Sequence, residues 1–355
     1  MFNVSVTESD KNPDQRNALG RVAIIGAGIA GLTVARKLQL LETDCTLFEK
    51  SRGPGGRMSS KRIPDSSADI GAQYFTVRNP AFGRFLNQHA GEDSYGLWRG
   101  QFRFQGADNV WQDMRPAERY VGTPRMTAIT RALSEGLDLK AGVRIASLSR
   151  EESESGNGWL LTDTEGNSQG FFNTVLVTAP PAQTRELLDA SGLERLSGDL
   201  SIEISRMQAC WTVVVHFPEG AAAGADAFMP NSRILHWAAN NSSKPGRNDK
   251  GEWWVLHSDP DWSDEHTETA PEDVIATMLA EFRETCGVTA GHGEIVHHRW
   301  LYARPRARTG PGHLWFAEQG IAIAGDWLEG GRVEGAFNSA DSLVQRWQSE
   351  RVLGR

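Results

Sequence analysis

The chain has few cysteines, no excess of positive charge and no long apolar run, and each lack excludes a class of protein. Its three cysteines, Cys45, Cys210 and Cys286, lie far apart without metal-ligand spacing, which favours reduced thiols in a cytoplasmic protein. The formal net charge of -8 argues against nucleic-acid binding, which needs clustered Lys and Arg. No apolar run approaches the roughly 20 residues of a membrane span, so no membrane partner is expected.

The remaining composition is that of a soluble globular protein. The 355 residues are 39% hydrophobic and 23% charged, and this length allows two domains. Residues 1–20 are polar and lack the apolar core of a signal peptide, so we expect a mobile N-terminal extension. Six of the 12 tryptophans fall between Trp211 and Trp300, which is typical of a region that holds a flat ligand or of aromatic sheet packing. The oligomeric state stays open, with a monomer favoured.

The most informative segment is Val22–Gly31, a buried strand that continues into a Gly-x-Gly-x-x-Gly turn and a helix. Gly26 permits the tight turn, Gly28 lets the backbone approach a pyrophosphate, and Gly31 lets the helix pack closely on the strand. Glu49 follows Gly31 by 18 residues, at the end of a second apolar run, where a carboxylate binds a ribose hydroxyl. The segment therefore predicts dinucleotide binding. A glycine-rich turn without a ligand would leave Glu49 unexplained.

Turn chemistry and apolar periodicity predict the elements of the rest of the chain. Thr123 is expected as the N-cap and Pro124 as the first residue of a helix that ends at Gly136. Residues 242–247 are expected to form an exposed loop. The other predicted elements are strands at 101–104, 139–148, 159–162, 174–178, 211–217, 253–257 and 321–324, and helices at 271–285 and 333–348.

These elements predict a discontinuous two-domain α/β organisation. A nucleotide-binding domain takes residues 21–78, 120–183 and 300–355, and a substrate domain is inserted as residues 79–119 and 184–299. Ligands of open α/β sheets bind at the carboxyl ends of the strands, so we expect the site in the cleft between the domains.

Three further features favour FAD over NAD. The glycines of Gly55–Arg57 let backbone approach a second face of a pyrophosphate, while the arginine supplies a bidentate contact. Asp326, in the Gly325–Asp326 pair, follows a buried strand, and its carboxylate can accept hydrogen bonds from the ribityl chain of a flavin. A helix beginning near Val333 would favour negative charge on a reduced flavin. Each feature has a structural alternative. Gly55–Arg57 can be a basic surface loop, Asp326 a plain turn residue, and the helix near Val333 an ordinary C-terminal helix.

Together these segments resemble the flavin-containing amine oxidase superfamily, and more closely the renalase-like bacterial oxidoreductases. The resemblance is carried by Lys50–Arg62, Gly71–Thr76, Met126–Ala132, Arg299–Pro305, Gly325–Trp327 and Gly331–Ala336. It implies an α/β protein with a Rossmann-like FAD-binding domain of the para-hydroxybenzoate hydroxylase and amine oxidase type. It also implies that the inserted substrate domain is built on a mixed sheet.

The resemblance further implies which residues hold the FAD, which is expected to be bound non-covalently. The Gly26–Gly31 turn, which we call the first glycine loop, and Glu49 would hold the ADP half of FAD. Residues 72–75 would line the isoalloxazine. Main-chain atoms of Ile145 would contact adenine, and residues 333–336 would lie at the pyrimidine edge. The full set is Gly26, Gly28, Ile29, Ala30, Gly31, Glu49, Lys50, Gly56, Arg57, Met58, Ala72, Gln73, Tyr74, Phe75, Ile145, Ala179, Gly325, Asp326, Val333, Glu334 and Ala336.

One departure from the superfamily bears on the reaction. Its amine oxidases usually place a lysine near flavin N5, but beyond Lys140 this chain has only Lys244 and Lys250, both in polar, loop-like sequence. The renalase-like group also lacks that lysine. Resemblance to it implies oxidation of the 2- and 6-dihydro isomers of NAD(P), with O2 reduced to hydrogen peroxide. The alternatives are an amine oxidase or other small-molecule oxidase, and a flavoprotein whose FAD is structural or sensory.

The implied reaction needs aromatic walls more than it needs a base. A dihydropyridine is already a hydride donor, so stacking it about 3–3.5 Å from flavin N5 supplies much of the catalysis. The candidates for the substrate site are Tyr74, His236, Trp237, Trp254, His257, Tyr302 and Arg304. Core packing is an equal alternative for each aromatic residue, and an interdomain salt bridge is an alternative for Arg304. His297 and His298 lack further ligands at metal spacing, so no metal is expected.

Overall fold

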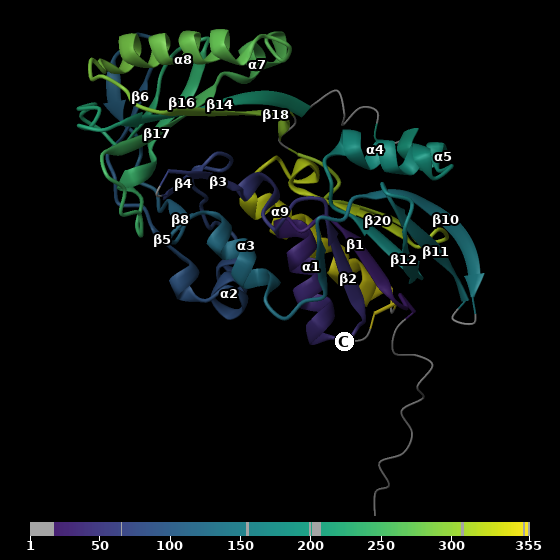
Figure 1. Cartoon of the computed structure of the whole chain (residues 1–355). Helices are drawn as coiled ribbons and strands as arrows, with labels where there is room; N and C mark the ends of the chain where they lie inside the picture. Colours follow the sequence, from purple (N-terminus) through teal and green to yellow (C-terminus); the bar gives the residue numbers. More distant parts are fainter. Residues whose placement is uncertain are drawn as a thin grey trace, which may run out of the picture.

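The computed structural model describes residues 18–64, 66–153, 156–198, 200, 207–306, 309–350 and 352–353. Residues 1–17 of the predicted N-terminal extension therefore lie outside the described residues. Figure 1 shows two lobes, one built on a six-stranded sheet and the other on a seven-stranded sheet. This arrangement confirms the predicted α/β fold class with two mixed sheets.

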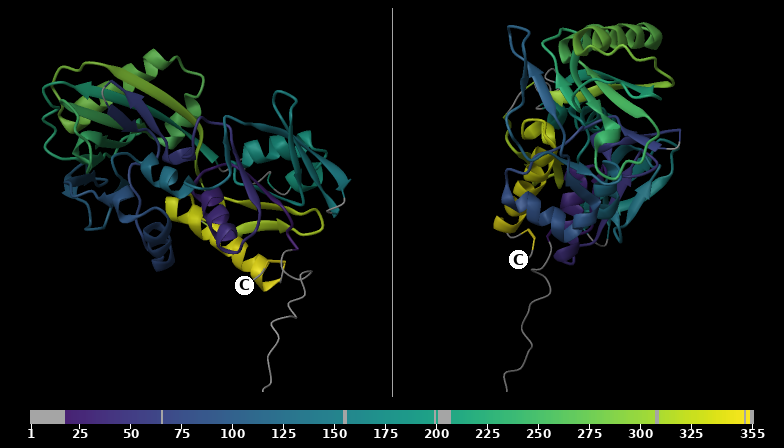
Figure 2. Two further views of the ribbon diagram at one scale, coloured as in Figure 1. Left: turned by 60° about the horizontal axis from the view of Figure 1, so that its bottom comes forward. Right: turned by 90° about the vertical axis from the view of Figure 1, so that its left-hand side faces the viewer.

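The six-stranded sheet carries the dinucleotide-binding unit. Its order is β19-β20-β13-β1-β2-β9, and only β19 runs antiparallel to its neighbour. The strands are Val22–Ile25 (β1), Cys45–Glu49 (β2), Leu139–Ala141 (β9), Thr174–Val177 (β13), His313–Phe316 (β19) and Ile321–Ala324 (β20). The central strands are apolar throughout because both faces of a parallel sheet are covered. Helices α1 (Ile29–Leu40) and α9 (Val333–Ser349) lie side by side on one face (Figures 1 and 2).

The prediction of one strand over 139–148 is wrong. The chain forms β9, turns at Gly142 with a φ of +77°, and then enters β10 (Ile145–Ser153) in a different sheet. That sheet is completed by β11 (Gly156–Asp163) and β12 (Ser168–Phe172), and helices α4 (Pro181–Ala190) and α5 (Glu194–Gly198) follow β13. Periodicity alone could not separate the two strands, because apolar residues continue to alternate across the turn, at Leu139, Ala141, Val143 and Ile145.

The seven-stranded sheet has the order β18-β14-β17-β16-β15-β6-β7. Its strands are Phe102–Gln105 (β6), Trp111–Asp113 (β7), Met207–Phe217 (β14), Ala227–Met229 (β15), Leu235–Asn240 (β16), Glu252–Ser258 (β17) and Ile295–Pro305 (β18). Helices α7 (Pro260–Glu265) and α8 (Pro271–Cys286) cover its outer face (Figure 1). The amphipathic helix predicted at 271–285 is confirmed, with Val274, Met278 and Phe282 fully buried against the sheet.

Small elements fill the space between the two sheets. They are the pair β3 (Ser60–Ile63) and β4 (Ser66–Asp69), the pair β5 (Tyr95–Leu97) and β8 (Tyr120–Gly122), and helices α2 (Pro80–His89) and α3 (Thr127–Ser134). The predicted helix start at Thr123 and Pro124 is wrong, because α3 begins at Thr127. The Asp69 carboxylate accepts from the N–H of the N-cap residue Met126 at 2.9 Å, so an acid distant in sequence holds the chain where the helix begins.

Two elements bear on the predicted domain boundaries. Phe82 and Phe85 of α2 each place their rings 5.2 Å from Phe337 of α9, so this helix packs on the six-stranded lobe. Strand β18 runs through the predicted boundary between residues 299 and 300. The division into domains stays a prediction. Among the described residues, no helix is both long enough and apolar enough to cross a membrane.

The first glycine loop allows a matched pair of substitutions. A Cβ at Gly31 would lie 2.0 Å from the Gly26 carbonyl oxygen, whereas a Cβ at Gly28 would meet nothing within 4 Å. We expect Gly31→Ala to lower the free energy of unfolding by more than about 2 kcal/mol, because backbone must move. Gly28→Ala should leave it unchanged or raise it by up to about 1 kcal/mol. Urea unfolding of nucleotide-free protein measures both, and equal losses would contradict the packing role of Gly31.

Candidate functional site

The first glycine loop leaves the N-terminus of α1 open. The helix begins after Gly28, and no side chain caps it. Glu49 is buried beside the loop, where its carboxylate accepts from the Ala27 N–H at 3.0 Å and from the Ser51 N–H at 2.8 Å. Free helical N–H groups and the positive end of the helix dipole suit a phosphate. The space in front of Gly28, which a Cβ would fill, thus fits a pyrophosphate.

A second glycine loop faces the first. The Gly55 N–H donates to the Ala27 carbonyl at 3.0 Å, and a Cβ at Gly56 would lie 3.6 Å from the Gly28 Cα. Met58 follows in the same short helix and is buried. Two stretches of bare backbone therefore meet at one place, as the predicted contacts of Gly28 and Gly56 with one pyrophosphate require.

Arg57 and Asp326 join the two ends of the chain. Nη1 and Nη2 of Arg57 both donate to the Asp326 carboxylate, with a distance of 2.9 Å between Nη1 and Oδ2. The same Nη1 lies 3.4 Å from the Ala303 carbonyl oxygen of β18. The sequence predicts a separate ligand contact for each partner. The structure brings them together in a bidentate pair at the carboxyl end of β20, and their contacts with FAD stay a prediction.

The N-terminus of α9 is also open at its backbone. Arg332 is the N-cap, and no side chain caps the helix. The buried Glu334 carboxylate accepts from the Arg78 N–H and from the Asn79 N–H, the latter at 2.9 Å. Glu334 therefore holds the chain before α2, while its own N–H and that of Val333 are left for an acceptor outside the helix.

Residues 70–73 are held by the seven-stranded sheet. The Ile70 carbonyl accepts from His257 Nε2 at 3.1 Å, from Trp300 Nε1 at 3.0 Å and from Thr212 Oγ1 at 3.1 Å. Burial lowers the pKa of His257 to about 4, so its imidazole is neutral at pH 7. Three donors on one carbonyl fix the position of the segment that is predicted to line the isoalloxazine.

Several substrate-site candidates meet beside this segment. The rings of Tyr74 and Trp237 lie 5.5 Å apart, and the Trp237 indole N–H is buried without a hydrogen-bond partner among the described residues. His236 Nε2 lies 3.4 Å from Arg304 Nη1. Burial lowers the pKa of His236, and the positive charge of Arg304 lowers it further. Tyr302 lies two residues from Arg304 on β18 and is half-buried.

Trp254 does not join this group. Its ring packs 5.1 Å from Phe282 of α8 and 6.0 Å from Phe228, and its indole N–H donates to Glu252 at 2.8 Å. Alternation along β17 turns Trp254 toward α8 while His257 points to the opposite face of the sheet. The aromatic-packing alternative therefore describes Trp254.

The remaining predicted cofactor residues lie around the two glycine loops and the strand ends. Lys50 donates to Gln183 at 3.0 Å, and the Ala179 carbonyl accepts from Trp327 Nε1 at 3.3 Å. Ile145 is buried at the start of β10, and the Ala72 N–H donates to Arg57 O at 2.9 Å. Phe75 is buried, with its ring 5.8 Å from Tyr120.

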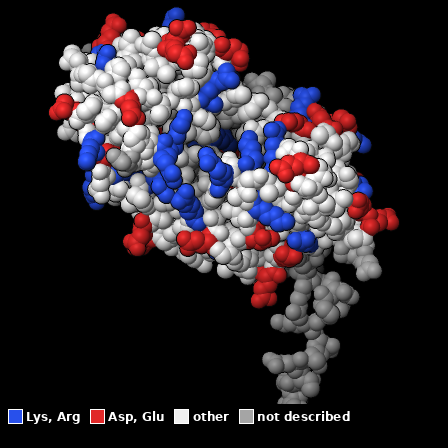
Figure 3. Space-filling view, in the orientation of Figure 1, with Lys and Arg blue, Asp and Glu red and all other residues white. Residues whose placement is uncertain are grey.

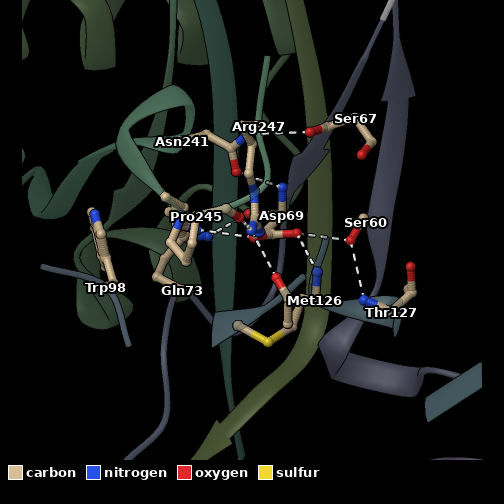
Figure 4. A network of polar contacts seen from close by, with 12 residues as sticks. Ser60, Ser67, Asp69, Gln73, Trp98, Met126, Thr127, Asn241, Pro245 and Arg247 are labelled. Carbon is tan, nitrogen blue, oxygen red and sulfur yellow. Dashed lines mark hydrogen bonds and ion pairs between the residues drawn. The ribbon is translucent and has the colours of Figure 1, made fainter. Parts of the chain in front are cut away.

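A buried charge cluster, formed by Asp69, Lys244 and Arg247, corrects the prediction of an exposed loop at 242–247 (Figure 4). The Lys244 side chain is 0% exposed, and its ammonium donates to Asp69 at 3.1 Å and to Gln73 Oε1 at 3.2 Å. Arg247 donates to the same Asp69 oxygen at 2.6 Å. The polar sequence is therefore buried inside the protein, because Lys244 and Arg247 share the carboxylate of Asp69 as their common ion-pair partner.

The protonation states in this cluster follow from the contacts. Burial by itself would raise the pKa of Asp69, but Lys244, Arg247, the Met126 N–H and the Ser60 hydroxyl hold it below its usual range. Burial lowers the pKa of Lys244 to about 8, an effect that Asp69 opposes. Sequence reasoning missed Asp69 and Arg247. The only available signal was an acid that ends a strand just before the Gly71–Thr76 motif.

Basic side chains also gather on the surface. Figure 3 shows Lys and Arg in a band across the middle of one face, with most carboxylates toward its outer parts. Burial lowers the pKa of Arg125, and the charges of Arg131 and Arg62 lower it further.

Within the described ranges, no group of three or more His, Cys, Asp or Glu side chains is arranged to hold a metal ion.

The fold and the two facing glycine loops define an α/β protein of the dinucleotide-binding class. Residues 24–89 match the NAD(P)-binding Rossmann-like domain, and residues 85–346 match the flavin containing amine oxidoreductase family. Because this second match spans most of the chain, the protein belongs to the flavin containing amine oxidoreductase family. It is a flavoprotein, and its cofactor is FAD, which the open helix N-termini and the glycine cradle fit.

Similar proteins have diverse activities. A hydroxyneurosporene desaturase of Rubrivivax gelatinosus is 43% identical over 113 residues, which are 29% of this chain and 21% of the desaturase. A possible lysine-specific histone demethylase 1 of Drosophila melanogaster is 42% identical over 64 residues, 18% of this chain and 7% of the demethylase. The chain thus matches only a small part of the length of these relatives.

Solved structures share the whole fold. A putative protoporphyrinogen oxidase from Exiguobacterium sp. 255-15 has a TM-score of 0.72 at 13% identity, covering 93% of this chain and 99% of its own. Putrescine oxidase bound to putrescine has a TM-score of 0.66 at 12% identity, with the same coverage. At such low identity these structures show the fold alone.

The charge cluster predicts an order of stability losses. Asp69→Asn leaves Lys244 and Arg247 as buried cations without a counter-charge, and breaking such a pair costs roughly 3–5 kcal/mol. Lys244→Met leaves Asp69 balanced by Arg247, so it should cost about 2 kcal/mol less. Urea unfolding at pH 7 measures both free energies. A loss for Lys244→Met equal to or above that for Asp69→Asn would contradict the charge balance described here.

The buried His257 predicts a pH dependence. Its pKa is about 4 in the folded protein and 6.5 ordinarily, so between these values only the unfolded state binds the proton. The free energy of unfolding should therefore fall as the pH drops from 6.5 to 4, by on the order of 3 kcal/mol from this residue. His257→Gln, which keeps a donor for Ile70, should flatten this slope in urea titrations. Substitution of the exposed His292 is the control and should leave it unchanged.

Proposed function

We propose that the protein is a renalase-like FAD-dependent oxidase that converts 2- or 6-dihydro isomers of NAD(P) to NAD(P)+, with O2 reduced to hydrogen peroxide. FAD, when bound, supplies the hydride acceptor and the route of electrons to O2. The protein's own residues hold and orient the dihydronicotinamide and exclude water from it. The substrate-site residues are Tyr74, His236, Trp237, His257, Tyr302 and Arg304.

The pair of Tyr74 and Trp237 carries this proposal. Their rings lie 5.5 Å apart beside residues 70–73, and a flat heterocycle fits against such a wall. The buried Trp237 N–H has no partner among the described residues, and a buried donor without an acceptor is costly. A carboxamide oxygen is an acceptor of the required kind, and nicotinamide carries one next to its reacting ring.

The protonation chemistry also supports a hydride donor. The neutral His257 already directs Nε2 to the Ile70 carbonyl, so this nitrogen is not free to take a proton from a substrate. Lys244 Nζ is held by Asp69 and Gln73, and its side chain is 0% exposed. A dihydropyridine needs no base because it releases a hydride without prior loss of a proton.

A second candidate, an amine oxidase, is favoured by one observation. Lys244 is buried and donates to Gln73, which is predicted to line the isoalloxazine, and burial lowers the pKa of this lysine to about 8. A lysine beside the cofactor is what amine oxidases of the family use. The two hydrogen bonds that engage Lys244 make us rank this candidate below the first.

Anaerobic mixing separates the candidates. We expect borohydride-generated dihydronicotinamide isomers to bleach the flavin absorbance rapidly, while putrescine and benzylamine leave it unchanged. Admission of air should restore the colour and release hydrogen peroxide. Bleaching by amines alone would establish the second candidate, and inertness to every donor would indicate a non-catalytic flavoprotein.

A matched pair of variants locates the reaction. Trp237→Leu removes the aromatic wall and should slow bleaching at least about tenfold, because the donor loses its stacking surface and a hydrogen bond. Trp262→Leu on α7, where the ring stacks 4.2 Å from His266, should leave the rate unchanged. The visible spectrum confirms that each variant keeps its FAD. Equal rates for Trp237→Leu and the wild type would contradict the assigned site.

A further inference from the structure

A pocket opens beside the paired rings of Tyr74 and Trp237, which we call the aromatic wall. None of the substrate-site residues named above lines this pocket. It has a volume of about 720 Å³ and is lined by residues 97–103, 113–114, 116–119 and 224. This volume is in the range of small-molecule sites. Arg99, Arg103 and Arg119 contribute three cations to the lining, and Asp113 and Glu118 contribute two carboxylates. We call it the Arg119 pocket.

Arg119 is the unusual residue of this pocket because it is a buried cation without a counter-charge. It is 8% exposed, and no carboxylate of the described residues forms an ion pair with it. Its guanidinium meets only neutral acceptors, the Ala117 carbonyl at 3.4 Å, the Arg115 carbonyl at 3.5 Å and the Met114 sulfur at 3.6 Å. Its Nε is buried without any partner among the described residues.

Stacking keeps this cation in place without neutralising it. The guanidinium carbon lies 4.3 Å from the centre of the Phe102 ring and 5.5 Å from that of Tyr74. Burying a charge in this way is costly unless an anion binds beside it. Glu118 is not the counter-charge of Arg119, because its carboxylate accepts from the Tyr120 hydroxyl at 3.1 Å and the residue is exposed.

Tyr74 connects the pocket to the aromatic wall. Its ring lies 5.5 Å from that of Trp237 and 5.5 Å from the Arg119 guanidinium. A ligand whose flat ring lies against Tyr74 and Trp237 can therefore extend a short polar arm to Arg119. A nicotinamide nucleotide has this form, since one ribose separates its ring from its first phosphate.

We propose that the Arg119 pocket binds the phosphate groups of the dinucleotide substrate, with Arg119 as the buried contact and Arg103 and Arg99 nearer the rim. This inference rests on the proposed function and names the part of the protein that distinguishes a dinucleotide from a free nicotinamide ring. Phosphate supplies the bidentate acceptor that suits a guanidinium and the negative charge that Arg119 lacks.

Product binding to the oxidised holoenzyme tests this proposal without turnover. NAD+ carries the phosphates and nicotinamide riboside does not, so we titrate both and follow the flavin absorbance and the heat of binding. Arg119→Met should weaken NAD+ binding at least about tenfold, the range for a hydrogen bond to a charged group, and should leave nicotinamide riboside binding unchanged. The salt dependence of NAD+ binding should become shallower in this variant.

Two variants guard against a purely structural effect. Arg103→Met, at a partly exposed position, should weaken NAD+ binding in the same direction, and Arg233→Met, at an exposed position outside the pocket, should not. A thermal melt checks that each variant is folded. If Arg119→Met weakens both ligands equally or neither, or if Arg103→Met has no effect on NAD+, the phosphate assignment is wrong.

The failure of this inference is distinguishable from that of the proposed function. Wild-type flavin that is bleached by dihydronicotinamide isomers, together with unchanged NAD+ affinity in Arg119→Met, would overturn the pocket assignment alone. Wild-type flavin that is not bleached by these isomers and does not respond to NAD+ would overturn both.

Discussion

The buried carboxylate of Asp69 is the contact on which the arrangement of the two lobes depends. It accepts from Ser60 of β3, from the N–H before α3, and from two cations of the loop after β16. Three segments, namely β3, the turn before α3 and the loop after β16, therefore meet on its two oxygen atoms. Lys244, the cation that enters from the seven-stranded lobe, also binds Gln73. The position of Gln73, which is predicted to lie beside the cofactor, is thus coupled to the buried ion pairs of Asp69.

The parts of the fold that could be predicted are those with a local cause. The glycine loop before α1 and the acid that ends β2 have the spacing typical of dinucleotide-binding units, and apolar runs mark the central parallel strands. Helix α8 was predictable because one of its faces is buried. The meeting of the Arg57 and Asp326 segments followed from the motifs, although their direct ion pair did not.

The remaining features have causes that lie far away in the sequence. Polar residues at 242–247 indicate a loop, and nothing nearby shows that Asp69 draws two of them inside. The start of α3 depends on the same distant carboxylate. Trp254 and Trp237 lie on neighbouring strands and look alike in sequence, but the first faces α8 and the second faces Tyr74. Pairing register decides such cases, and register is not a local property.

The order of the strands has a consequence for biosynthesis. In the sheet order β20-β13-β1-β2, the first-made strand, β1, has the much later β13 as one of its two neighbours, and α9 packs on α1. In a nascent chain that has emerged only as far as Val177, strand β13 still lacks its neighbour β20. Helix α1 still lacks its neighbour α9. The emerging polypeptide must therefore keep an apolar helix face covered, by a chaperone or by transient contacts, until its last fifth leaves the ribosome.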